Sequence, residues 1–265
     1  NNKFSFSLVD KKFEKFKLKS NITFDEIKFK ETLNLPININ NGEAKIDYKN
    51  EFLEINIKSK YYFLRDEKKQ SNLGDAKFLV SKKKNENIKI KGNFYNSGNK
   101  LNTKQVQKIL NFDSKHIPDQ NLQFDSTNLI QFELNNRREI EKYKINSKFK
   151  INELEIFYKD KNLKSFFPEY KNKVFLKDNL IEINIDKKIK DIKFEGLFSL
   201  DNILTNGFKI NLVQNSEILD FDTYINLNNI FINFNSLDYR KKKETNSNLI
   251  LNGRYKKNLT LKKIK

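Results

Sequence analysis

Apolar and polar residues alternate along most of the chain, a pattern that places one kind of side chain on each face of a β-strand. Within residues 180–186, three isoleucines point one way and three polar residues point the other. Runs of this kind recur roughly every 8–15 residues, the spacing of strands joined by turns. They lie at Phe4–Leu8, Phe52–Ile57, Ile88–Ile90, Tyr143–Ile151, Leu180–Asp186, Ile192–Phe194, Phe208–Leu212, Phe221–Leu227, Ile230–Phe234 and Asn248–Leu251. The pattern predicts an antiparallel meander.

Turn residues separate several of these runs. Asn41-Gly42 and Asn206-Gly207 predict tight hairpin turns, because Asn and Gly tolerate the positive backbone angles that such turns require. Residues 96–99, 65–70 and 186–190 are polar or charged and are typical of connections between strands.

Helical periodicity is confined to short segments. Asn102 and Thr103 can cap a short helix, and the apolar residues at positions 106, 109 and 110 share one face of it. Residues 162–170 predict a second short turn or helix, and residues 135–142 form either a polar hairpin loop or one helical turn. Amphipathic helices long enough to cover a broad sheet are absent from the pattern.

These elements predict an all-β fold with minor α content, namely an elongated, curved antiparallel meander that forms a groove and carries one or two short helices. A meander with one apolar face must bury that face against a second sheet, in a closed barrel or against a ligand. A two-layer β-sandwich is therefore the alternative fold. We expect β segments at 1–100 and 127–265, joined by a helix and loop at 101–126.

Composition refines this prediction. Hydrophobic residues make up 37% of the chain and charged residues 32%, yet 13% are aromatic, which disordered chains lack. The net charge of +18 suggests a polyanion partner, but lysines on solvated strand faces explain the charge better, so no nucleic acid is expected. The chain has no Met, even at position 1, and alternation continues to both ends, so we expect a fragment of a longer protein.

Residues suited to catalysis or metal binding are sparse. His116 is the single histidine, there is no cysteine, and the isolated glycines do not form a phosphate-binding loop. Glu153 and Glu155 lie on one strand face, but surface carboxylates among many lysines explain them better than an acid–base pair. We therefore expect no enzymatic activity, catalytic residue, metal, cofactor or small-molecule substrate.

An uncovered apolar groove can hold lipid without any reactive group. Each buried methylene contributes about 0.8 kcal/mol, so a chain of about 16 carbons gains on the order of 10 kcal/mol. The partners that this hypothesis predicts are phospholipid acyl chains. Alternation alone nominates seven groove positions, which are Ile181, Ile183, Ile185, Ile192, Phe194, Ile225 and Leu227.

The last stretch, Phe221–Ile264, resembles the repeated unit of the AsmA-like family, which includes TamB and YhdP relatives. It combines an apolar strand, a Leu-Asp-Tyr sequence, a basic turn and a small-polar strand, and Phe166–Leu200 is similar. The likeness departs at Arg240–Glu244, where charged residues replace a Lys-Pro-Gly-like turn. The resemblance implies a periplasmic β-groove protein, tethered to the inner membrane by a segment outside this chain, that supports phospholipid transport between the inner and outer membranes and outer-membrane biogenesis.

Three other functions compete with this hypothesis. The main alternative is a structural or adhesive β module of a secreted surface protein, with a dry two-layer core. An outer-membrane barrel is disfavoured by the lysine-rich strand faces and the short helix. Polyanion binding predicts an affinity that depends steeply on salt.

Overall fold

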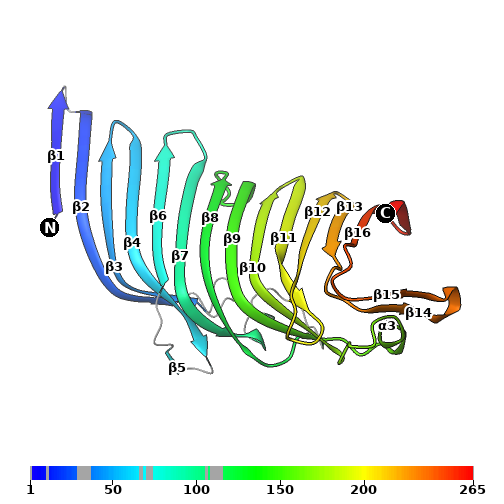
Figure 1. The fold of residues 1–265 in the computed structure, drawn as a ribbon. Helices are drawn as coiled ribbons and strands as arrows, with labels where there is room; N and C mark the ends of the chain where they lie inside the picture. Colours follow the sequence, from blue (N-terminus) through cyan, green and yellow to red (C-terminus); the bar gives the residue numbers. More distant parts are fainter. Residues whose placement is uncertain are drawn as a thin grey trace. The chain divides into compact units, whose positions relative to one another are not determined.

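Long strands dominate the computed structural model, which describes residues 2–9, 12–28, 37–65, 68–69, 74–104, 107 and 116–264 (Figure 1). The strands are β1 (Asn2–Val9), β2 (Lys12–Lys28), β3 (Ile37–Lys49), β4 (Phe52–Arg65), β5 (Lys68–Lys69), β6 (Gly74–Lys83), β7 (Ile88–Asn102), β8 (Asn121–Leu134), β9 (Ile140–Phe157), β10 (Lys173–Asp186), β11 (Ile189–Ser199), β12 (Asn206–Asn215), β13 (Ile218–Asn226), β14 (Ile232–Phe234), β15 (Tyr239–Lys241), β16 (Asn248–Tyr255) and β17 (Leu259–Ile264). Helix α3 (Lys161–Phe166) and the 3-10 turn η1 (Asn235–Leu237) complete the elements with assigned bounds.

The strands hydrogen-bond in chain order, as a meander requires. Every described strand except β14 and β15 belongs to one sheet, in which β5 pairs with β4 and β13 pairs with β16 across the β14–β15 hairpin. Neighbouring strands are antiparallel, and the two ends of the strand order, β1 and β17, do not pair with each other. The predicted all-β, antiparallel meander is confirmed, and the described strands do not form the alternative two-layer sandwich.

The chain divides into two units. Unit 1 comprises residues 1–99, 126–147 and 185–187, and unit 2 comprises residues 100–125, 148–184 and 188–265. Strands β7, β8, β9 and β10 therefore contribute residues to both units.

Unit 1 carries an apolar face that runs across β2, β3, β4, β6 and β7. In cross-strand register, Ile46 faces Ile55, Ile55 faces Val80 and Val80 faces Ile90, so all four side chains lie on the same side of the sheet. The buried core of this face is a cluster of Ile39, Tyr61 and Ala76, against which Phe78 and Phe94 pack. The Phe94 ring meets the rings of Tyr61 and Phe78 edge to face, with centroids 5.4 and 5.2 Å apart.

Some turn predictions are wrong. Asn41-Gly42 lies inside β3, where a bulge interrupts the pairing with β4 and Asn41 has a φ of 49°. A bulge and a hairpin turn both use residues that tolerate positive φ, so the dipeptide does not distinguish them. Gly207 also lies in a strand, β12, and pairs with Leu197. Residues 96–99 belong to β7.

Other local predictions are confirmed. Residues 135–139 form the hairpin loop between β8 and β9, and residues 187–188 connect β10 to β11. Helix α3 (Lys161–Phe166) overlaps the second predicted helical segment, residues 162–170. The Asp160 carboxylate caps the helix by accepting from the Asn162 and Leu163 backbone N–H groups. In the first predicted helix, residues 103, 104 and 107 are helical and the remainder lies outside the described residues, as do residues 66, 67 and 70 of one predicted connection.

Candidate functional site

Unit 2 carries a second apolar face, which four strands build in register. Residues that face each other across paired strands point to the same side of the sheet. Phe194 of β11 faces Ile210 of β12, and Phe208 of β12 faces Ile225 of β13, which in turn faces Leu249 of β16. We call this surface the apolar face of unit 2; it comprises Ile192, Phe194, Phe198, Phe208, Ile210, Leu212, Leu219, Phe221, Ile225, Leu249 and Leu251.

The opposite face of the same strands is polar. Lys209 and Glu195, directly opposed on β12 and β11, approach to 2.9 Å, and Arg254 forms a two-pronged ion pair with Asp220, at 2.7 and 2.9 Å. These pairs are exposed, so each contributes little to stability. They establish that the sheet of unit 2 is amphipathic, with water on one side.

The apolar face is incompletely covered. Of its eleven members, Phe208 is buried, at 7% exposure, and the other ten are half-buried. At the β16–β17 end the exposed fraction rises to 49% for Tyr255, 60% for Leu259 and 65% for Ile264. Apolar surface that a second layer would normally bury is therefore open in the described structure.

Aromatic rings pack against one another and against the backbone on this surface. Phe208 packs edge to face against Phe194, with centroids 4.8 Å apart, and against Phe198 at 6.2 Å. Gly253 of β16 lies opposite Phe221 of β13, and a Cβ built on that glycine would stand 2.3 Å from the ring. The missing side chain lets the ring rest on the neighbouring strand, as aromatic residues do over glycine in other sheets.

The structure brings only some of the seven groove positions nominated by the sequence onto the apolar face of unit 2. Ile192, Phe194 and Ile225 lie together on the apolar face of unit 2. Leu227 follows β13 in the connection to β14, where its N–H donates to the Ser247 carbonyl at 2.9 Å. Three half-buried isoleucines alternate along β10, with Ile181 and Ile183 in unit 2 and Ile185 in unit 1.

Sequence reasoning did not nominate the central members of the face. Phe208 and Ile210 of β12, and Leu251 of β16, stand in alternating runs that the sequence does reveal. Their membership of the site follows from cross-strand register, which alternation does not encode.

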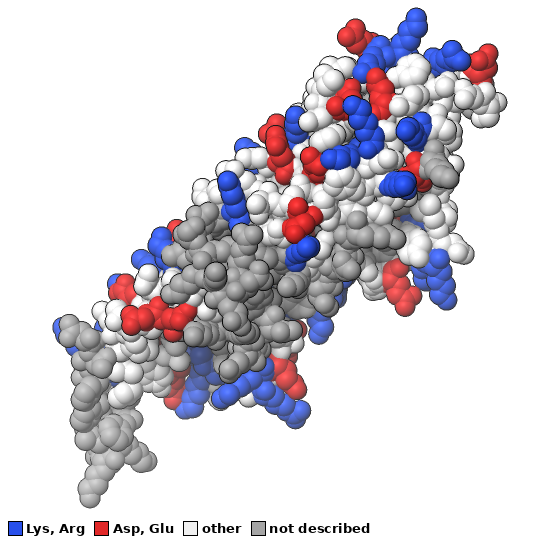
Figure 2. All heavy atoms as spheres, turned by 90° about the horizontal axis from the view of Figure 1, so that it is seen from below, with Lys and Arg blue, Asp and Glu red and all other residues white. Residues whose placement is uncertain are grey.

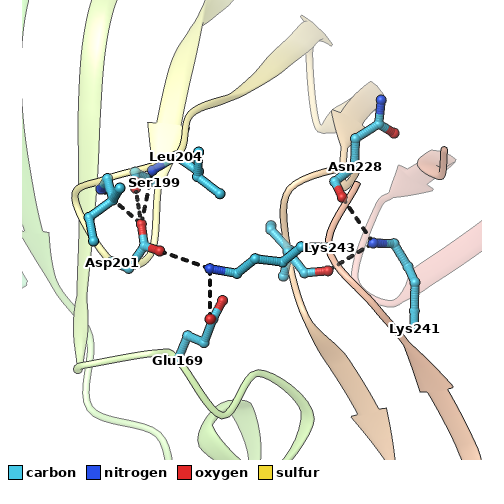
Figure 3. A network of polar contacts seen from close by, with 9 residues as sticks. Glu169, Ser199, Asp201, Leu204, Asn228, Lys241 and Lys243 are labelled. Atoms are coloured by element: carbon cyan, nitrogen blue, oxygen red, sulfur yellow. Dashed lines mark hydrogen bonds and ion pairs between the residues drawn. The ribbon is translucent and has the colours of Figure 1, made fainter. Parts of the chain in front are cut away.

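The segment between β13 and β16 is bound to the rest of unit 2 through the side chains of two lysines, Lys241 and Lys243 (Figure 3). Lys243 follows β15, and its Nζ lies 2.7 Å from Glu169 Oε1 and 3.2 Å from Asp201 Oδ2. Lys241 is 3% exposed, and its Nζ donates to the carbonyls of Asn228, Ile230 and Lys242 at 3.2, 2.8 and 3.0 Å. These contacts join three segments of the chain, residues 158–172, 200–205 and 227–247. We call the three segments together the edge module.

The electrostatics of the edge module follow from these contacts. Burial tends to raise the pKa of Asp201, but hydrogen bonds from Ile203 N–H, Ser199 Oγ, Leu204 N–H and Lys243 outweigh it and lower the pKa to about 2. Burial lowers the pKa of Lys241. The hydrogen bond to Glu169 is the largest cause of the raised pKa of Lys243. Asp201 is therefore ionised at neutral pH, where its carboxylate can bind Lys243.

His116 and Glu155, which the sequence singled out as possible reactive groups, both have partners in the structure. His116 Nδ1 lies 3.2 Å from the Phe157 carbonyl, and its ring meets the Tyr158 ring at a tilt of 60°, with centroids 5.1 Å apart. Glu155 forms an ion pair with Lys173 at 3.2 Å. Within the described ranges, no three His, Cys, Asp or Glu side chains are grouped to hold a metal ion.

None of the described helices combines the length and the apolar character needed to cross a membrane.

Comparison with known proteins found no match for this chain. No protein-family model, curated protein or solved structure matches the sequence or the fold. The resemblance to the AsmA-like family therefore stays a prediction, and the apolar face of unit 2 is the feature from which a function is best argued.

Proposed function

We propose that this chain binds phospholipid acyl chains along the apolar face of unit 2. In this proposal it acts in the periplasm, as a segment of an AsmA-like protein that is tethered to the inner membrane by residues outside this chain. Its role is to support phospholipid transport between the inner and outer membranes and hence outer-membrane biogenesis.

One observation carries the proposal: a continuous apolar face, backed by a polar face, is incompletely covered by the described residues of the chain. Exposed apolar patches larger than a few hundred Å² are uncommon on soluble proteins and mark sites of interaction. A flexible hydrocarbon chain suits this surface, because it needs no hydrogen-bond donor or acceptor and follows an irregular floor of Phe, Ile and Leu.

The free energies are sufficient for lipid binding. An acyl chain of about 16 carbons gains on the order of 10 kcal/mol when its methylenes leave water, at about 0.8 kcal/mol each. Immobilising the lipid costs part of this gain, and the surplus sets the affinity. The Phe221 ring, which rests on the backbone at Gly253, adds area on which methylenes can pack.

The test uses two neighbouring residues of β13 that point to opposite faces. Ile225 lies on the apolar face and faces Leu249, whereas Tyr224 lies on the polar face and donates to Asn248 Oδ1 at 2.7 Å. A fluorescent lysophospholipid with a 16-carbon chain, used as monomers, is titrated against each protein. We expect Ile225→Asp to weaken binding by at least about tenfold, because a carboxylate beside an acyl chain costs roughly 2 kcal/mol or more.

The Tyr224→Asp variant is the matched control and should bind like the wild type. Circular dichroism verifies that both variants keep their strands. Wild-type protein that binds no lysophospholipid, or equal losses in the two variants, would contradict the proposal. The structural or adhesive β module would then be the better interpretation.

A further inference from the structure

The edge module exposes apolar residues at its surface. Ile203, in the loop between β11 and β12, is 79% exposed, the highest value among the large apolar residues that the structure describes. Tyr239, at the start of β15, is 49% exposed. Phe234 of β14 contacts Tyr239, Phe166 of α3 contacts Phe234, and both phenylalanines are half-buried. An isoleucine so fully in water contributes nothing to the core of this chain.

These residues are held firmly in place. The rings of Phe166 and Phe234 are 5.0 Å apart and those of Phe234 and Tyr239 are 6.1 Å apart, which joins α3 to the β14–β15 hairpin (Figure 1). The Asp201 carboxylate accepts from the Ile203 N–H at 2.9 Å and also binds Lys243. The loop that presents Ile203 is therefore tied to the hairpin that presents Tyr239.

The edge module also carries exposed basic side chains. Lys164 lies in α3, Lys171 follows that helix, Arg240 lies in β15 and Lys242 follows β15. All four are exposed, and within the described part of the chain none of them forms an ion pair. Among the module's carboxylates, Glu169 and Asp201 bind Lys243 and Asp160 caps α3. Asp238 and Glu244 are exposed.

We propose that the edge module docks on the surface of an anionic phospholipid bilayer. Tyrosine rings favour the headgroup region of a membrane, isoleucine enters the acyl boundary, and Lys and Arg are attracted to anionic headgroups. The inference rests on the proposed function, because an acyl-binding face needs a bilayer from which to receive lipid. It adds the place where the protein touches that bilayer.

The chain contains no tryptophan, so a single substitution creates a local reporter. In Tyr239→Trp, the indole stands in the edge module; in the control Tyr95→Trp, it stands on β7 of unit 1, where Tyr95 is 40% exposed. Each protein is mixed with vesicles of phosphatidylcholine and phosphatidylglycerol at 7:3. We expect the emission of Tyr239→Trp to move to shorter wavelength and to be quenched by brominated acyl chains. The emission of Tyr95→Trp should not change.

Charge reversal tests the electrostatic part of the proposal. Arg240→Glu with Lys242→Glu, in the Tyr239→Trp background, should reduce vesicle partitioning by about tenfold or more. Pure phosphatidylcholine vesicles should bind the parent protein more weakly than the mixed vesicles. An unshifted Tyr239→Trp emission at high lipid, or an equal shift in Tyr95→Trp, would overturn the docking proposal.

The two proposals can fail independently. Ile203→Asp should abolish docking while leaving the binding of monomeric lysophospholipid intact, because Ile203 lies outside the apolar face of unit 2. Ile225→Asp should lose lysophospholipid binding and keep the docking signal of Tyr239→Trp. Loss of both properties in either variant would show that a single lipid site exists, and the separate docking surface would be rejected.

Discussion

A lysine buried among carbonyl groups is the sharpest feature at the scale of single residues. Lys241 belongs to the Lys-Lys-Lys run that departs from the AsmA-like pattern, yet its ammonium group is enclosed and its three donors are matched by three backbone carbonyls. Lys242 beside it is exposed. Burial of a charge is tolerated here because every proton has a partner.

Removing that ammonium group should destabilise the protein. We expect Lys241→Met, which keeps the length of the side chain but removes its donors, to lower the free energy of unfolding by about 2–3 kcal/mol, since buried carbonyls are left without partners. Lys242→Met should change it by less than about 0.5 kcal/mol. Urea denaturation followed by circular dichroism measures both values, and equal losses would show that the three hydrogen bonds contribute little.

At the scale of elements, glycines opposite aromatic residues shape the apolar faces. Gly253 lies under the Phe221 ring, and Gly42 lies in the same way under Phe24 of the neighbouring strand. The pairing recurs in both units, so each face has places where a ring lies along the sheet instead of standing away from it.

A methyl group at Gly253 should push Phe221 off the sheet. We expect Gly253→Ala to cost about 1–3 kcal/mol of stability, because the new Cβ would meet both the ring and the Thr260 carbonyl. Gly207→Ala provides the control, since no atom lies within 4 Å of its added Cβ; its stability should be unchanged or raised by up to about 1 kcal/mol. Equal urea midpoints for the two variants would argue against the packing of Phe221 on Gly253.

At the scale of the whole molecule, the net charge of +18 must be accommodated. Positively and negatively charged residues are interspersed over the side shown in Figure 2. Ion pairs such as Lys60–Asp75, at 3.2 Å, and Lys148–Glu182, at 3.0 Å, are exposed and each contributes about 0–1 kcal/mol. The excess of lysine adds a general repulsion that these pairs do not remove.

Salt should therefore stabilise this protein. Between about 0.02 and 0.5 M sodium chloride the screening length falls below about 10 Å, which weakens repulsion across the molecule more than attraction within close pairs. We expect the urea midpoint to rise over this range, with potassium chloride as the control for ion-specific effects. A midpoint that falls with salt would mean that the ion pairs outweigh the net repulsion.

The sequence by itself determined the β character, most strand positions and the short helix α3. Alternation repeats every two residues, and a strand carries that period within itself, so the apolar sides of β11 and β13 can be read without a structure. This is why Ile192, Phe194 and Ile225 were found. The polar loop between β8 and β9 was found because Asn and Arg interrupt the alternation there.

The tertiary structure alone decided which strands meet and which lysine is buried. The pairing of β13 with β16 joins residues on either side of the β14–β15 insertion, and it brings Leu249 and Leu251 onto the apolar face. Asn41-Gly42 became a bulge and not a turn because strand pairing continues on both sides of it. Lys241 and Lys242 are indistinguishable in sequence, and the carbonyls of the surrounding chain select one of them for burial. Hydrogen bonds between segments that are distant in the sequence determine the strand pairing, the bulge and the buried lysine. The alternation of residues within one strand does not encode those hydrogen bonds.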